Sequence, residues 1–121
     1  MKWIDIQKEY FRMELDETYN IYKHVNRNYK GGDIVIIKSS PSKIISFLEA
    51  LYQINPEYLN YIKEVILRYS ASEHRGWGYN TSFLYVDQNF ANKIKLQGHF
   101  RWIDRGWGDF SASLTYDLSN L

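Results

Sequence analysis

The tetrapeptide Arg-Gly-Trp-Gly occurs twice in this chain, at residues 75–78 and again at residues 105–108. The same offset aligns Leu84 with Leu114 and Asp87 with Asp117, so a unit of turn plus strand recurs between residues 73 and 117. We interpret this region as β-structure, and the predicted fold is built around it.

Residues 93–102 have the clearest strand pattern in the chain. Apolar side chains alternate there with polar ones, which predicts one buried and one solvated face; the apolar set is Ile94, Leu96, Phe100 and Trp102. Two further strands are predicted at residues 81–87 and 109–118, separated from the first by short turn-like segments. Three consecutive strands with short connections predict an antiparallel β-meander over residues 79–118.

Helical periodicity dominates residues 1–72, where we predict helices at residues 3–13, 17–29, 41–53 and 55–69. Residues 17–29 also alternate well enough for a strand, and both interpretations stay open. Residues 33–38 form a β-branched run that predicts one further strand, buried on both faces. The chain is therefore predicted to be one α+β domain of residues 1–121, with N-terminal helices packed on one face of a C-terminal antiparallel β-meander.

The predicted fourth helix has an unusually wide apolar surface. Beside its main apolar stripe lies a second one, formed by Tyr58, Tyr61 and Val65. So wide an arc cannot be covered from one side. Either the helix is sandwiched between the sheet and another helix, or its tyrosine stripe faces a partner.

Composition narrows the classes of function. Fifteen basic and fourteen acidic residues leave a net charge of +1, so the chain lacks the strong positive field of many nucleic-acid-binding proteins. The absence of cysteine excludes disulfides, a thiolate nucleophile and cysteine-ligated metals. The three histidines have no metal-ligand spacing, so we expect neither a metal nor a cofactor. No apolar segment reaches the length of a signal peptide or a membrane span, which predicts a cytoplasmic location without a membrane.

The two Arg-Gly-Trp-Gly loops are the first candidate binding site. Glycines on both sides let Trp77 and Trp107 swing toward a partner, and Arg75 and Arg105 are close enough in sequence to stack on the rings or bind a carboxylate or phosphate. In a meander the strands after the two loops run parallel, which would place both loops at one end of the sheet. The alternative is that each tryptophan fills the core and each arginine is solvated.

The polar face of the predicted middle strand is the second candidate site. It is predicted to combine basic side chains with rings from the preceding strand, namely Lys93, Lys95, His99, Arg101, Phe83 and Tyr85. Basic residues interleaved with rings on a sheet are used to bind RNA. A layout of this kind also occurs in small ribonucleases, where a histidine acts as general acid or base. By this analogy, His99 would take that role and Arg101 would stabilise negative charge. The alternative is a solvated face without a function.

Aromatic content favours protein binding over these alternatives. Eleven Tyr, six Phe and four Trp exceed what a core of this size needs, and such residues dominate binding hot spots. We predict a small non-catalytic protein that acts by binding another protein, as an inhibitor or toxin-immunity protein does. The alternative is an RNA-binding or RNA-cleaving domain that uses the basic face. The identity of the partner and the oligomeric state do not follow from the sequence.

Overall fold

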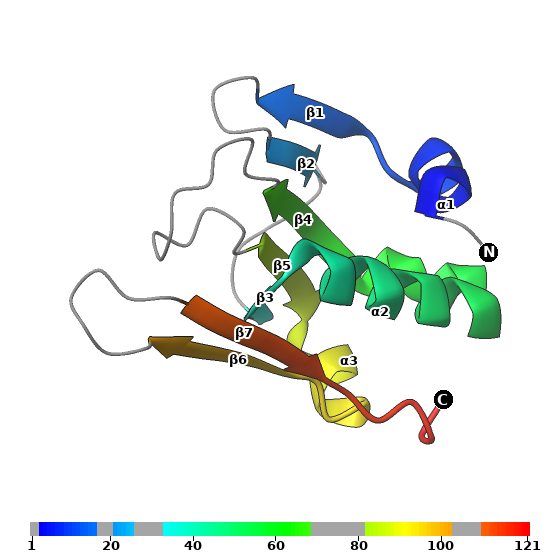
Figure 1. Cartoon of the computed structure of the whole chain (residues 1–121). Helices are drawn as coiled ribbons and strands as arrows, with labels where there is room; N and C mark the ends of the chain where they lie inside the picture. The colour runs from blue at the N-terminus through cyan, green and yellow to red at the C-terminus, as the bar shows by residue number, and fades with distance from the viewer. Residues whose placement is uncertain (1–2, 17–20, 26–32, 69–81, 103–109) are drawn as a thin grey trace.

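A computed structural model describes residues 3–16, 21–25, 33–68, 82–102 and 110–121, with the backbone alone at residues 16, 99–102 and 110–112. Figure 1 shows the described elements, which are in chain order α1 (Trp3–Tyr10), β1 (Met13–Asp16), β2 (Ile21–Val25), β3 (Ile34–Ser39), α2 (Pro41–Ile54), the 3-10 helix η1 (Pro56–Tyr61), β4 (Ile62–Arg68), β5 (Ser82–Asp87), α3 (Gln88–Lys93), β6 (Gln97–Trp102) and β7 (Phe110–Thr115).

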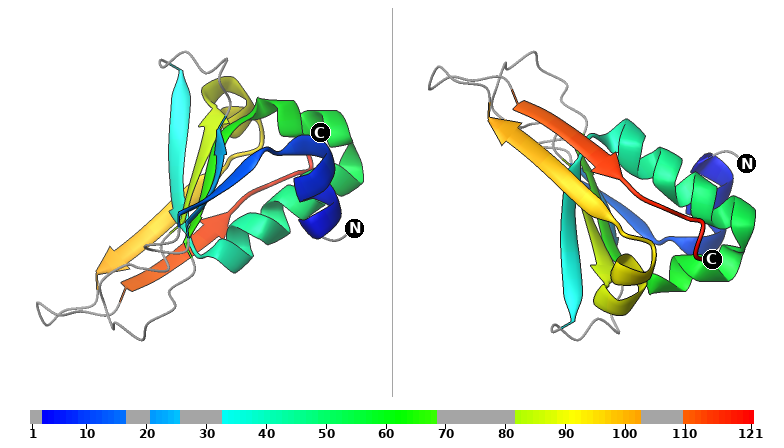
Figure 2. Two further views of the ribbon diagram at one scale, coloured as in Figure 1. Left: turned by 90° about the horizontal axis from the view of Figure 1, so that it is seen from above. Right: turned by 90° about the horizontal axis from the view of Figure 1, so that it is seen from below.

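Five of these strands form an antiparallel sheet in the order β1-β2-β4-β5-β3, and β6 pairs with β7 in a separate ribbon. Helix α2 lies across one face of the sheet, where it is joined by α1, and no described helix lies across the opposite face (Figure 2). The ribbon contacts β3, and its strand β7 also contacts α2. The class is therefore α+β, as predicted, but the arrangement of its strands is different.

Local sequence signals determine α2, which confirms the helix predicted at residues 41–53. The Ser40 hydroxyl accepts a hydrogen bond from the backbone N–H of Lys43 at 3.4 Å, and Pro41 occupies the first turn, where its missing N–H costs nothing. Phe47, Leu48 and Leu51 on its inner side are fully buried. This helix therefore supplies one wall of the core, and the sheet supplies the other.

The predicted three-stranded meander is wrong. Strand β5 pairs with β4 and β3, whereas β6 pairs with β7. The short helix α3 separates β5 from β6 because the Asp87 carboxylate accepts a hydrogen bond from the backbone N–H of Phe90 at 3.0 Å and caps that helix. Lys93 ends the helix and Lys95 has a positive φ of 50°, so the strand predicted from residue 93 begins only at Gln97.

Two of the predicted helices are also wrong. The start signal at Asn55 is real, because its side chain accepts a hydrogen bond from the Glu57 N–H at 3.1 Å, but it produces only η1. From Ile62 onward the chain is extended, since a β-branched segment here has strand partners on both sides, β2 and β5. The described part of the segment at residues 17–29 is the strand β2, the alternative interpretation of its alternating pattern. The first helix ends at Tyr10, three residues before β1 begins.

The β-branched run at residues 33–38 is a strand, as predicted, but it is not buried on both faces. It forms β3 at one edge of the five-stranded sheet, and its Ile36 side chain is 52% exposed. Its inner side contributes Ile37 to the core.

The ribbon meets the sheet at Gly98 of β6. A Cβ atom at this position would lie 2.5 Å from Cγ2 of Ile37 and 2.8 Å from the backbone nitrogen of Lys38. Both distances are shorter than van der Waals contact, so the close approach of β6 to β3 requires a residue without a side chain.

A buried histidine makes the stability of the fold depend on pH. His24 faces the core side of β2, with its ring centroid 4.4 Å from that of Phe11. Burial lowers the pKa of His24, and a hydrogen bond with the backbone of Arg12 opposes this shift only in part. The unfolded chain therefore binds this proton more readily than the folded chain does, so the contribution to stability is present above the unfolded pKa of about 6.5 and is lost as the pH falls below it.

We therefore expect the free energy of unfolding, measured by urea denaturation, to decrease between about pH 7.5 and about pH 5.5. The variant His24→Gln should show a flatter pH dependence over this interval. His74→Gln and His99→Gln serve as matched controls for the other two histidines. An unchanged slope in His24→Gln would contradict the assignment.

Candidate functional site

The face of the five-stranded sheet that points away from α2 is called here the outer face. Burial alternates along the strands, so Val65 and Leu84 point into the core while their neighbours point outward. The register places the outward residues in cross-strand rows. One row is Lys23, Ile66, Phe83 and Lys38, and the next is Val25, Glu64, Tyr85 and Ile36.

The centre of these rows forms the outer patch, which consists of Ile36, Ile66, Phe83 and Tyr85. Ile36 is more than half exposed and the other three are partly exposed. Cross-strand neighbours on one face lie about 4.5–5.5 Å apart between Cβ atoms, so the four side chains form one contiguous apolar surface.

Charged residues surround the outer patch. The guanidinium carbon of Arg68 lies 5.3 Å from the ring centroid of Phe83, a cation–π contact that holds this charge beside the patch. Strand β4 is fixed there by a hydrogen bond from the backbone N–H of Arg68 to the Ser82 hydroxyl, at 2.9 Å. Lys38 lies across from Phe83, and Glu64 across from Tyr85. An aromatic centre with a polar rim is a composition that many protein-binding surfaces share.

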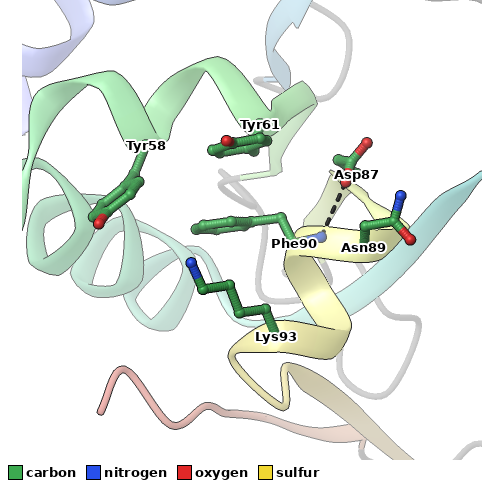
Figure 3. Close-up of a pocket in the computed structure, with 6 residues that line it drawn as sticks. All are labelled: Tyr58, Tyr61, Asp87, Asn89, Phe90 and Lys93. Carbon is green, nitrogen blue, oxygen red and sulfur yellow. Dashed lines mark hydrogen bonds between the residues drawn. The ribbon is translucent and has the colours of Figure 1, made fainter. Parts of the chain in front are cut away.

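A second feature, called here the aromatic groove, lies between η1 and α3. It has a volume of about 170 Å³ and is lined by Tyr58, Tyr61, Asp87, Asn89, Phe90 and Lys93. The Tyr61 ring stacks on Phe90 with centroids 4.5 Å apart and ring planes 6° apart, and Tyr58 lies 5.8 Å from the same ring (Figure 3). Because Asp87 ends β5, the groove adjoins one end of the outer face.

The sequence-predicted site residues fall into separate parts of the structure. Phe83 and Tyr85 lie on the outer face, as the pairing of β5 requires. Lys93 ends α3 and lines the aromatic groove, and Lys95 lies in the turn that follows, so neither belongs to a strand beside β5. The basic residues that accompany Phe83 are instead Lys38 and Arg68.

The remaining predicted residues are only partly described. The backbones of His99 and Arg101 belong to β6, where they pair with Ser113 and Ser111 of β7. The two Arg-Gly-Trp-Gly loops, with Arg75, Trp77, Arg105 and Trp107, lie outside the described residues. Their predicted binding roles stay predictions.

Sequence reasoning missed Ile36, Ile66 and Arg68 as surface residues of the sheet. The signal that would have found Ile66 and Arg68 is the β-branched content of residues 62–68, which were assigned to a helix instead. The tyrosine stripe with Tyr58 and Tyr61 was recognised as a candidate partner surface, and both residues line the aromatic groove.

The described residues contain neither a membrane-spanning helix nor a cluster of metal ligands. No described helix has the length and apolar character needed to cross a membrane. In the same residues, no group of three or more His, Cys, Asp or Glu side chains is placed to hold a metal ion.

Comparison with known proteins gives one limited similarity. The chain is 33% identical over 84 residues to a protein of Dictyostelium discoideum named probable polyketide synthase 27. The alignment covers 64% of this chain and 3% of that protein, so it shows neither the family nor the activity of the chain. No protein-family model matches the chain, and no solved structure matches it.

Proposed function

We propose that this chain is a small non-catalytic protein that acts in the cytoplasm by binding another protein, as an inhibitor or toxin-immunity protein does. The observation that carries the proposal is the outer patch. Four apolar side chains, two of them aromatic, form a contiguous surface on a sheet face that no described helix crosses. Burial of such a surface by a partner is favourable by roughly 25 cal/mol per Å² of apolar area.

The residue types of the outer patch suit a rigid interface. Phe83 and Tyr85 have only two side-chain torsions each, and the strand backbone already fixes their direction, so binding costs them little conformational entropy. Arg68 is held against the Phe83 ring before any partner arrives. A chain without cysteine is also compatible with the reducing cytoplasm.

Affinity purification from the native host with the full chain as bait tests this proposal. The wild type should retain one stoichiometric protein, and Ile36→Asp should reduce the affinity for that purified protein about 100-fold, in the range of hot-spot substitutions. Ile36 is exposed, so the variant is expected to fold, which a thermal melt verifies. Ile54→Asp changes an isoleucine of similar exposure at the end of α2 and should bind like the wild type. Equal binding of the two variants would contradict the proposal.

An alternative function is binding of single-stranded RNA. It is supported by the cation–π pair of Arg68 and Phe83 and by Lys38, which lies across from the ring. The same purified proteins distinguish the two. RNA binding whose affinity falls steeply with added salt, together with a failure to retain any stoichiometric protein, would favour the alternative.

A further inference from the structure

The aromatic groove has opposite polar character at its two ends. Figure 3 shows the Lys93 side chain extending toward Tyr58 and the Phe90 ring, with Asp87 and Asn89 on the other side of that ring. The Lys93 amine forms no ion pair within the described part of the chain. The groove therefore has a lysine at one end and the Asp87 carboxylate at the other.

The apolar part of the groove is built to contact a flat ring. Phe90 is only 4% exposed because Tyr61 lies parallel on it, whereas Tyr61 itself is 42% exposed. Tyr58 adds a second ring, tilted by 36° to that of Phe90. Aromatic rings prefer offset-stacked or edge contacts with other rings, and the two tyrosines offer both.

The volume is sufficient for one ring. The groove measures about 170 Å³. An apolar cavity of about 150 Å³ in another protein accommodates benzene, so a single six-membered ring with short substituents fits.

The charges define the substituents. An anionic group is attracted to the Lys93 amine at one end of the groove and repelled by the Asp87 carboxylate at the other, so it would lie at the Lys93 end. At the other end, Asp87 uses one carboxylate oxygen to cap α3, which leaves its second oxygen to receive a hydrogen-bond donor.

We propose that the aromatic groove is a binding site for a single-ring aromatic acid that carries a hydroxyl group opposite its carboxylate. The carboxylate pairs with Lys93, the ring contacts Tyr58 and Tyr61, and the hydroxyl donates to Asp87. The site is separate from the outer patch, and its ligand is a small molecule rather than a protein.

Titration of the isotope-labelled full chain, followed by amide chemical shifts, tests this site with three probes: 4-hydroxybenzoate, benzyl alcohol and benzylamine. We expect 4-hydroxybenzoate to shift the amides of η1 and α3 with a dissociation constant on the order of 1 mM, a value typical of so small a ligand. Benzyl alcohol and benzylamine should both bind more weakly, because neither can pair with Lys93 and donate to Asp87 at the same time.

Two variants separate the charge from the ring contacts. Lys93→Gln should weaken 4-hydroxybenzoate about fivefold, as expected for one exposed charge pair, and leave benzyl alcohol unchanged. Lys43→Gln, at an exposed lysine of α2, is the matched control and should change nothing. Tyr61→Leu, checked for folding by its amide spectrum, should weaken both probes.

Three results would overturn the proposal. The first is the absence of saturable shifts at η1 and α3 with 4-hydroxybenzoate. The second is binding of benzylamine as tight as that of the acid, and the third is equal affinity of wild type and Lys93→Gln for the acid. None of these results affects the proposal for the outer patch. Its test uses Ile36→Asp and the control Ile54→Asp, and neither residue lines the groove.

Discussion

Replacing Phe47 with alanine is expected to lower the free energy of unfolding by about 3–5 kcal/mol, the usual loss for a buried phenylalanine. Phe47 is fully buried in the middle of α2, and its ring contacts that of Tyr116 edge-on at 4.8 Å. Tyr116 directly follows β7, so this side chain connects the helix both to the sheet core and to the C-terminal segment. Removal of the ring leaves a cavity that three parts of the fold would have to close.

Urea denaturation at neutral pH measures the Phe47→Ala effect. Ser46→Ala, at the exposed neighbouring position of the same helix, is the matched control and should change stability by less than about 0.5 kcal/mol. Phe47→Leu should fall between the two, because it retains most of the apolar volume. A loss in Phe47→Ala as small as in the serine control would mean that this packing is not formed in solution.

Replacing Gly98 with alanine is the second large effect that we expect, a loss of about 1–3 kcal/mol from overpacking. The added methyl group would meet both the Ile37 side chain and the backbone of Lys38. The side chain can move, but the backbone of β3 is fixed by its pairing with β5. The ribbon would therefore have to lift away from the sheet.

Gln97→Ala is the matched control for Gly98→Ala, because it changes the exposed neighbouring residue of the same strand. Combining Gly98→Ala with Ile37→Ala should give less than the sum of the two single losses, since the shortened side chain no longer clashes with the new methyl group. A Gly98→Ala variant with the wild-type denaturation midpoint would show that the ribbon does not cross β3 at this point.

Elements with local start signals were predictable from the sequence. The helix α2 was predicted because Ser40 and Pro41 specify its beginning within three residues. The strand β3 was predicted from its β-branched composition, but its place at a sheet edge was not. Composition determines that a segment is extended, whereas its position in the sheet depends on partners elsewhere in the chain.

Elements that depend on distant partners were not predictable in the same way. The segment that forms β4 has the apolar spacing of a helix stripe and the β-branched residues of a strand, and its pairing with β2 and β5 decides between them. The separation of β5 from β6 did have a local signal, the Asp87 cap of α3, which was not recognised as a helix start. Because α3 lies between β5 and β6, these two strands do not pair and the predicted meander does not form.

The candidate site was predicted only in part for the same reason. Phe83 and Tyr85 were identified as surface rings of a strand, and they lie on the outer face of β5. Their neighbours Ile36 and Arg68 come from strands that are remote in sequence, so no local pattern connects them with these rings. Lys93 was singled out for its charge, but α3 places it in the aromatic groove instead.

The strand order has a consequence for how the chain can be divided. Ile34 pairs with Asp87, and Ile21 pairs with Arg68, so the sheet joins segments that are separated by long stretches of chain. A fragment that stops before β5 would leave β3 without its neighbour and β4 with one open edge. We therefore expect that the first half is not an autonomous unit. Folding must close large loops before the central hydrogen bonds form, which slows it relative to a helical bundle of equal length.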